Sequence, residues 1–204
     1  LFFVLSGFLI TGILVDMKRA LPGGTFFIKF YGRRFLRIFP LYYFYLALAL
    51  VISLVFFNLG ALTKKMEVFW EHLPYALTVT YNFFYVVAKE PSMFLSHFWT
   101  LSVEEQFYII WPLLIFLTPE KHFKKLFLGA IAFGFLFRLG FTLVYQANPN
   151  PAIVNGVAHG LYPLTFSHMD AFGMGALLSQ YKFRNSTKQF AVLAVTLPII
   201  GFAA

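Results

Sequence analysis

Two adjacent carboxylates and an amide, Glu104, Glu105 and Gln106, stand within the apolar stretch 97–112. Ionisable side chains at the depth of a lipid bilayer are costly, and they usually face a bundle interior or a water-filled cavity, where they mark function. The rest of the chain has to explain why these groups occur there.

Helical spacing separates the two acids. On a helix, Glu104, Tyr108 and Trp111 share one face, whereas Glu105 points elsewhere. A carboxylate in such a place is able to orient a sugar hydroxyl, position a cation or act as a base. The alternative is an interfacial acid that lipid headgroups solvate at the start of a membrane span. The residues alone leave both interpretations open.

Three arginines form a second cluster. Arg33, Arg34 and Arg37 stand at i, i+1 and i+4, so Arg33 and Arg37 share a helix face and Arg34 lies beside them. Guanidinium groups bind phosphate through two parallel hydrogen bonds, which makes the cluster a candidate for a phosphate-bearing ligand. By spacing alone, a topology signal or a site for anionic headgroups is favoured over it.

Other polar residues are predicted to have structural roles. A buried Arg138 needs a partner, and Glu104, Glu105 or Asp170 is able to supply it. His168 and Asp170 are two residues apart and cannot share a helix face, so we predict no metal site. The remaining histidines are predicted at interfaces: His72, His97, His122 and His159.

Small residues favour close helix packing. Gly173 and Gly175 are expected to allow two helices to approach, and Ser6 with Gly7 is either a packing contact or a backbone approach point. Ser6 and Tyr108 are our predicted substrate contacts.

Composition excludes a soluble domain. Hydrophobic residues make up 60% and charged residues 12% of the chain, and mean hydropathy is +0.76. Soluble domains carry nearer a quarter charged residues, so an integral membrane protein is predicted. The net charge of +8 lies between apolar spans, where topology signals belong, so nucleic acid is not expected as a partner. The absence of cysteine excludes disulfides and thiol chemistry.

The apolar segments predict an all-α, polytopic bundle of about six spans within a single transmembrane domain, 1–204. Because the chain begins and ends inside apolar runs, we expect this domain to be incomplete at both ends. The aromatic segment 72–87 is shorter than the roughly 20 residues needed to cross, so it is predicted to be interfacial or re-entrant. The predicted spans are 1–15, 41–59, 99–117, 126–145, 166–181 and 190–204.

Cations between the spans predict the orientation. Six lie in segment 17–37, three in 119–125 and three in 182–188, whereas the intervening loops hold three altogether. The positive-inside rule places the three richer segments in the cytoplasm. Glu104 is then expected near the outer face and the arginines at the inner face.

Four segments, 2–11, 30–40, 99–112 and 169–178, together resemble successive motifs of the acyltransferase 3 family. This resemblance implies an enzyme of the bacterial inner membrane that transfers an acyl group, commonly acetyl, from cytoplasmic acyl-CoA to a hydroxyl of a cell-surface glycan. It implies acyl-CoA (acetyl-CoA) as co-substrate, no permanently bound cofactor, and partners that include a glycan or lipid-linked glycan acceptor and membrane lipids.

The resemblance also assigns roles. Arg34 and Arg37, with Arg33 beside them, match the family's donor-binding motif, and Glu104 matches the acid of its WSL-x-x-E signature. The family's essential histidine lies in a helix before the first motif and is not among these residues. We therefore expect the chain alone to be inactive. The competing interpretations are a transporter or flippase of a glycan or lipid-linked precursor, which would show paired broken helices, and a non-catalytic sensor or assembly subunit.

Overall fold

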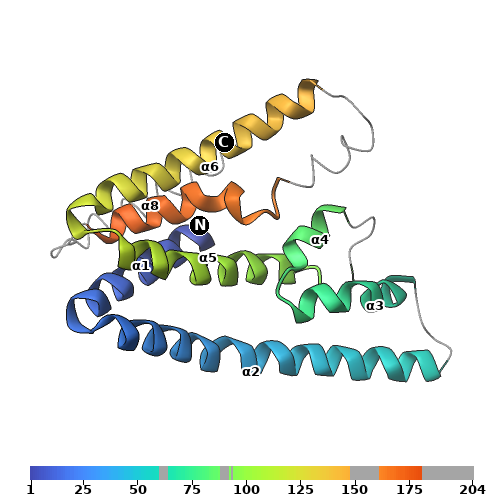
Figure 1. Ribbon diagram of the computed structural model, residues 1–204. Coiled ribbons are helices and arrows are strands. Elements are labelled where there is room, and N and C mark those ends of the chain that lie inside the picture. The colour runs from blue at the N-terminus through green and yellow to red at the C-terminus, as the bar shows by residue number, and fades with distance from the viewer. Residues whose placement is uncertain (60–63, 88–91, 93, 148–160, 181–204) are drawn as a thin grey trace, which may run out of the picture.

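The computed structural model describes residues 1–59, 64–87, 92, 94–147 and 161–180. In these ranges all regular secondary structure is helical and no strand occurs, which confirms the predicted all-α fold. Figure 1 shows the arrangement. The elements are α1 (Phe2–Ala20), α2 (Gly23–Asn58), α3 (Lys64–Leu77), α4 (Tyr81–Val87), α5 (Phe98–Leu117), η1 (Glu120–His122), α6 (Phe123–Ala147), η2 (Thr165–His168) and α8 (Met169–Ser179).

Three helices in the described part of the chain are long and apolar enough to cross a membrane: α2, α5 and the helical segment Glu120–Val144. They contain the predicted span 99–117 and most of the predicted spans 41–59 and 126–145. The predicted span 166–181 begins as a 3-10 turn and continues as α8, which has eleven residues. The expected cytoplasmic segment 182–188 and the span 190–204 lie outside the described residues. The prediction of six spans is therefore not confirmed.

Helix α2 differs from the expected basic segment followed by a span. It is one continuous helix of 36 residues that passes through Pro40. A proline inside a helix removes one backbone hydrogen bond but does not always end the helix. Because α2 is continuous, it brings Arg34 alongside α5 instead of leaving it in a loop.

Segment 72–87 is not a crossing helix. It contains the end of α3 and all of α4, and these helices of 14 and 7 residues measure about 21 and 10 Å, against a hydrocarbon thickness of about 30 Å. The two helices form a hairpin whose turn, Thr78–Thr80, points toward α5 (Figure 1). The Tyr42 hydroxyl of α2 donates to the Ala76 carbonyl at 2.6 Å and fixes the end of α3.

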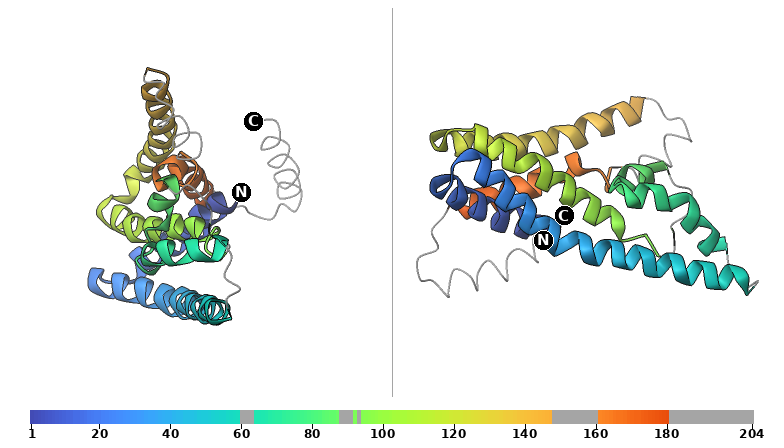
Figure 2. Two further views of the ribbon diagram at one scale, coloured as in Figure 1. Left: turned by 90° about the vertical axis from the view of Figure 1, so that its right-hand side faces the viewer. Right: turned by 60° about the horizontal axis from the view of Figure 1, so that its bottom comes forward.

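Helix α8 lies between α1 and α6, as the views in Figures 1 and 2 agree. Glycines make this possible. A Cβ at Gly175 would collide with the Val4 carbonyl of α1, one at Gly7 with the Phe172 carbonyl, and one at Gly173 with Ile131 of α6. The predicted packing role of these small residues is confirmed.

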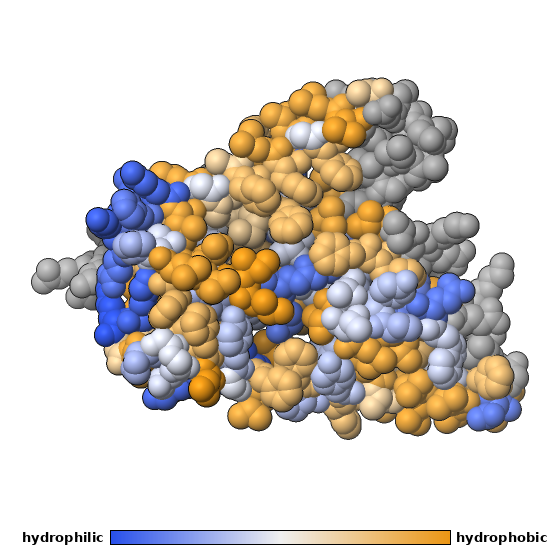
Figure 3. Space-filling view, viewed as in Figure 1, coloured by the Kyte–Doolittle hydropathy of each residue, from blue (hydrophilic) through white to orange (hydrophobic). Residues whose placement is uncertain are grey.

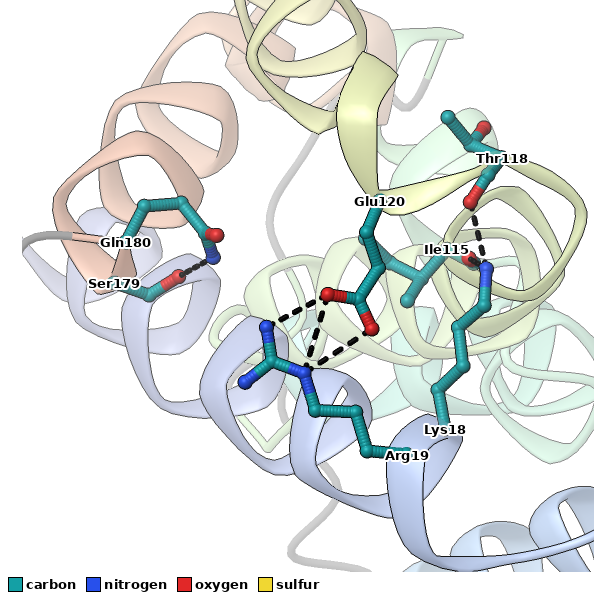
Figure 4. Close-up of polar contacts among 7 residues, drawn as sticks. All are labelled: Lys18, Arg19, Ile115, Thr118, Glu120, Ser179 and Gln180. Atoms are coloured by element: carbon teal, nitrogen blue, oxygen red, sulfur yellow. Dashed lines mark hydrogen bonds and ion pairs between the residues drawn. The ribbon is translucent and has the colours of Figure 1, made fainter.

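Lysine and arginine at the end of α1 fasten it to the end of α5 (Figure 4). Lys18 Nζ satisfies carbonyls that the last turn of a helix leaves without partners, and its charge suits the negative end of the helix dipole. Arg19 pairs with Glu120 at 2.7 Å, and this hydrogen-bonded pair raises the pKa of Arg19. The Lys18 acceptors are the carbonyl oxygens of Ile115, Phe116 and Thr118, at 2.8, 2.9 and 2.6 Å.

Successive contacts give the directions of the helices. Ser6 of α1 meets Glu104 of α5, and Thr11 meets Trp111, so α1 and α5 run parallel. In α2, Tyr31 meets Ile109 whereas the later Tyr42 packs on the earlier Phe98, so α2 runs against α5. Consecutive membrane crossings would alternate in this way.

Candidate functional site

The centre of α5 presents its two acids to different neighbours. Glu104 and Glu105 are both buried, at 7% and 8% exposure. Consecutive helical residues are turned by about 100°. Glu104 faces α1, and Glu105 lines a cavity between α2 and α5. The predicted separation of the two acids is confirmed, and neither carboxylate is a freely solvated interfacial acid.

Glu104 belongs to a hydrogen-bonded group. The Ser6 hydroxyl donates to Glu104 Oε1, and Tyr108 lies one turn further along the same face of α5. Ser6 and Tyr108 are buried as well. The structure thus brings together three predicted site residues from two parallel helices. Their roles in binding or catalysis stay predictions.

Arg34 reaches this group from α2. Its guanidinium carbon lies 4.7 Å from the centroid of the Tyr108 ring, and its charge interacts favourably with both Glu104 and Glu105. Tyr108 is nine residues before the end of α5, about 13 Å along the helix. The expected separation of the arginines from Glu104 on opposite faces is therefore wrong for Arg34, because continuous α2 carries it into the bundle.

The other two arginines do not join the cluster. Arg33 and Arg37 are exposed on α2, whereas Arg34 is half-buried. The i, i+4 relation explains this division, since it places Arg33 and Arg37 together on a face that points away from α5. The predicted role of the three arginines in holding a phosphate-bearing donor stays a prediction.

A cavity of about 790 Å³ adjoins the cluster. Arg34, Glu105 and Tyr108 form part of its wall, and Figure 3 shows hydrophilic atoms recessed between apolar atoms in the middle of the visible face. A mostly apolar cavity with a few polar groups is typical of ligand sites. Its other lining residues are Tyr31, Phe35, Phe39, Tyr43, 77–80, Phe83, Gln106, Ile109, Ile110, Thr165 and Phe166.

A polar network that the sequence analysis missed adjoins the same cavity. Gln106 and Asn82 exchange hydrogen bonds of 2.8 and 3.2 Å, and the Thr165 hydroxyl donates to Gln106 Oε1. Asn82 also donates to Thr165, at 3.2 Å. Amides inside apolar segments were the available signal, because a buried amide needs partners. Those partners are 24 and 59 residues away along the chain, so spacing alone did not identify them.

The remaining polar residues have structural roles. Arg138 pairs with Asp170 through two contacts of 3.0 and 2.6 Å, which selects one of its three predicted partners. His72 is buried within the protein, and its Nδ1 lies 2.9 Å from the Tyr81 hydroxyl; its position at a membrane interface stays a prediction. Burial lowers the pKa of His72, and nearby Glu71 offsets this only in part. In the part of the chain that the structure describes, no three potential metal ligands come together.

Comparison with known proteins identifies the relatives. A family model described as "Acyltransferase domain", that of acyltransferase 3, matches residues 1–204. An uncharacterized protein of Haemophilus influenzae is 31% identical over all of this chain and 84% of its own length. No solved structure matches.

Two named relatives are O-acetyltransferases. Peptidoglycan O-acetyltransferase OatA of Listeria monocytogenes is 33% identical over 76% of this chain and 25% of its own length. O-acetyltransferase OatA of Staphylococcus aureus is 27% identical over 70% and 24%. The aligned part of this chain thus corresponds to about a quarter of each of these two proteins.

Proposed function

Because this chain belongs to the acyltransferase 3 family, we propose that it forms the core of a membrane O-acyltransferase that transfers an acetyl group from acetyl-CoA to a hydroxyl of a cell-surface glycan. The observation that carries the proposal is the position of Arg34, which lies beside Tyr108, interacts with both buried carboxylates and lines the cavity. The names of the two O-acetyltransferases favour acetyl as the group, and the name of the Listeria relative favours peptidoglycan as the class of acceptor.

The ends of the helices support a cytoplasmic donor side. Lys18, Arg19 and the cation-rich segment 119–125 lie together where α1 and α5 end, and by the positive-inside rule this end faces the cytoplasm. Arg34 lies about 13 Å from that end by the helical rise and faces the cavity. An acyl-CoA arriving from the cytoplasm therefore meets Arg34 before it reaches the outer half of the bundle.

Acyl transfer from a thioester to a hydroxyl requires stabilisation of the negative charge that develops on the carbonyl oxygen. The acceptor hydroxyl attacks the thioester carbonyl, the carbonyl oxygen becomes an oxyanion, and collapse forms the ester and releases CoA as its thiol. A base takes the hydroxyl proton, and the family resemblance assigns this role to a histidine outside these residues. In our proposal Arg34 stabilises developing negative charge or the donor's phosphates. Glu104, which accepts a hydrogen bond from Ser6, orients that guanidinium and the acceptor.

Substitution of Arg34 tests the proposal. In the complete protein, reconstituted with labelled acetyl-CoA and peptidoglycan, Arg34→Ala should lower kcat/KM for acetyl-CoA by about 10- to 100-fold, the effect of losing one charge-assisted hydrogen bond. Lys124→Ala is the matched control, because it removes an exposed cation near the same end and should leave the rate unchanged. Equal rates for Arg34→Ala and wild type would overturn the assignment.

A further inference from the structure

The turn between α3 and α4 contains a strained residue. Val79 has a φ of 58°, a left-handed conformation that β-branched side chains rarely adopt. Residues persist in such conformations only where surrounding structure holds them, and they cluster at functional sites. The conformation of Val79 therefore indicates that contacts from other elements hold this turn.

Side chains from other elements hold the turn. Gln106 Nε2 of α5 donates to the Val79 carbonyl at 3.4 Å, and Gln106 is fixed in turn by Asn82 and Thr165. The Tyr43 hydroxyl donates to the Leu77 carbonyl at 3.1 Å, as Tyr42 does to Ala76. Bonds from α2 thus hold the end of α3 just before the turn, and α5 bonds the turn itself through Gln106.

The turn lies beside the middle of α5. Gln106 is eight residues from the start of α5, about 12 Å from that helix end. Non-helical backbone at membrane depth occurs where it is buried in protein or lines a cavity. Here Thr78, Val79 and Thr80 line the same cavity as Arg34 and Glu105. The hairpin enters from the end of α5 opposite Lys18, which is the outer end in the proposed orientation.

Hydrogen-bond capacity defines what the turn is able to bind. The Thr78 and Thr80 hydroxyls lie 2.8 Å apart, and the carbonyls of Pro74 and Tyr75 lie within hydrogen-bonding distance, so both protons have acceptors inside the turn. Each hydroxyl oxygen has two lone pairs, so three of the four remain for a ligand. The turn thus offers acceptors, which suit the O–H and N–H groups of a sugar and do not suit phosphate oxygens.

We propose that the Thr78–Thr80 turn is the subsite that holds the glycan acceptor, by accepting hydrogen bonds from its hydroxyl or amide groups on the side of the cavity next to Glu105. This inference rests on the proposed function, because it gives the cavity a second substrate. The donor approaches along Arg34 from the opposite end. The cavity then brings the two substrates together at the middle of α5.

The test uses isosteric changes in the complete, reconstituted protein. Thr78→Val and Thr80→Val remove the hydroxyls and keep the side-chain shape. We expect the KM for soluble peptidoglycan fragments to rise about 5- to 10-fold for each, the effect of one hydrogen bond. The KM for acetyl-CoA and the slow hydrolysis of acetyl-CoA by water should not change. Thr80→Ser keeps the hydroxyl, so its KM for the fragments should equal that of the wild type.

Thr142→Val is the matched control, because Thr142 also bonds a carbonyl of its own helix, that of Arg138, and does not line the cavity. An unchanged acceptor KM in both valine variants, or an equal rise in the KM of both substrates, would overturn the proposal.

Direct binding of the fragments separates this inference from the proposed function. If the wild-type protein does not use acetyl-CoA, the donor assignment fails, but weaker fragment binding by Thr80→Val would still support the subsite. If the valine variants bind the fragments as tightly as the wild type does, the subsite is wrong whichever donor is used.

Discussion

At the scale of single residues, the site places two buried acids and one arginine close together inside an apolar bundle. Carboxylates on consecutive residues repel each other, and the single positive charge of Arg34 offsets part of that repulsion. The sequence predicted that Glu104 and Tyr108 share a face. It did not predict Arg34 beside them, because the pattern of positive charges predicts that segment 17–37 is cytoplasmic. In the structure most of this segment belongs to α2, which continues into the bundle.

The Glu104 carboxylate carries a prediction at this scale. Glu104→Gln keeps the side-chain size, and its amide oxygen is able to accept the Ser6 proton, but it removes the charge that faces Arg34. We expect kcat for acetyl transfer to fall by about 10- to 100-fold, with binding of acetyl-CoA retained. Equilibrium binding and single-turnover transfer measure the two quantities. Loss of acetyl-CoA binding would contradict the acceptor-side and orienting role of Glu104.

At the scale of elements, glycines place α8 between α1 and α6. The sequence indicated close packing at Gly173 and Gly175, because small residues at such spacing are typical of helix contacts in membranes. Which helices meet there depended on tertiary structure. Arg138 of α6 pairs with Asp170 of α8. The sequence left three partners open for Arg138, and the structure shows which of them it contacts.

The crossing of α1 and α8 gives a prediction about stability. Gly175→Ala places a methyl group against the Val4 carbonyl, so the backbones have to separate, and overpacking of this kind costs about 1–3 kcal/mol. The apparent melting temperature of the detergent-solubilised complete protein should fall by several degrees. Gly12→Ala in α1 meets no atom within 4 Å and serves as the control, which should match or exceed the wild type. Equal melting temperatures for the two variants would contradict the close approach.

At the scale of the whole molecule, the sequence predicted an all-α membrane protein, and its apolar runs located the helices well. Hydropathy does not indicate how far a segment enters the membrane or which distant residues it contacts. It therefore did not predict the hairpin turn that Gln106 bonds. Segment 72–87 was too short to cross and contained Pro74, so an interfacial or re-entrant position was predictable. The strained turn at Val79 was not, because valine gives no local signal for a left-handed conformation.

The central claim is that two substrates approach from opposite ends of α5 and meet beside Arg34. Sealed vesicles of one orientation, containing the complete protein, test it most directly. Labelled acetyl-CoA, which does not cross the membrane, is supplied on one side and soluble peptidoglycan fragments on the other. We predict label on the fragments only when acetyl-CoA is on the side of Lys18 and Arg19, and loss of this transfer in Arg34→Ala. Equal transfer with acetyl-CoA on the opposite side would contradict the account.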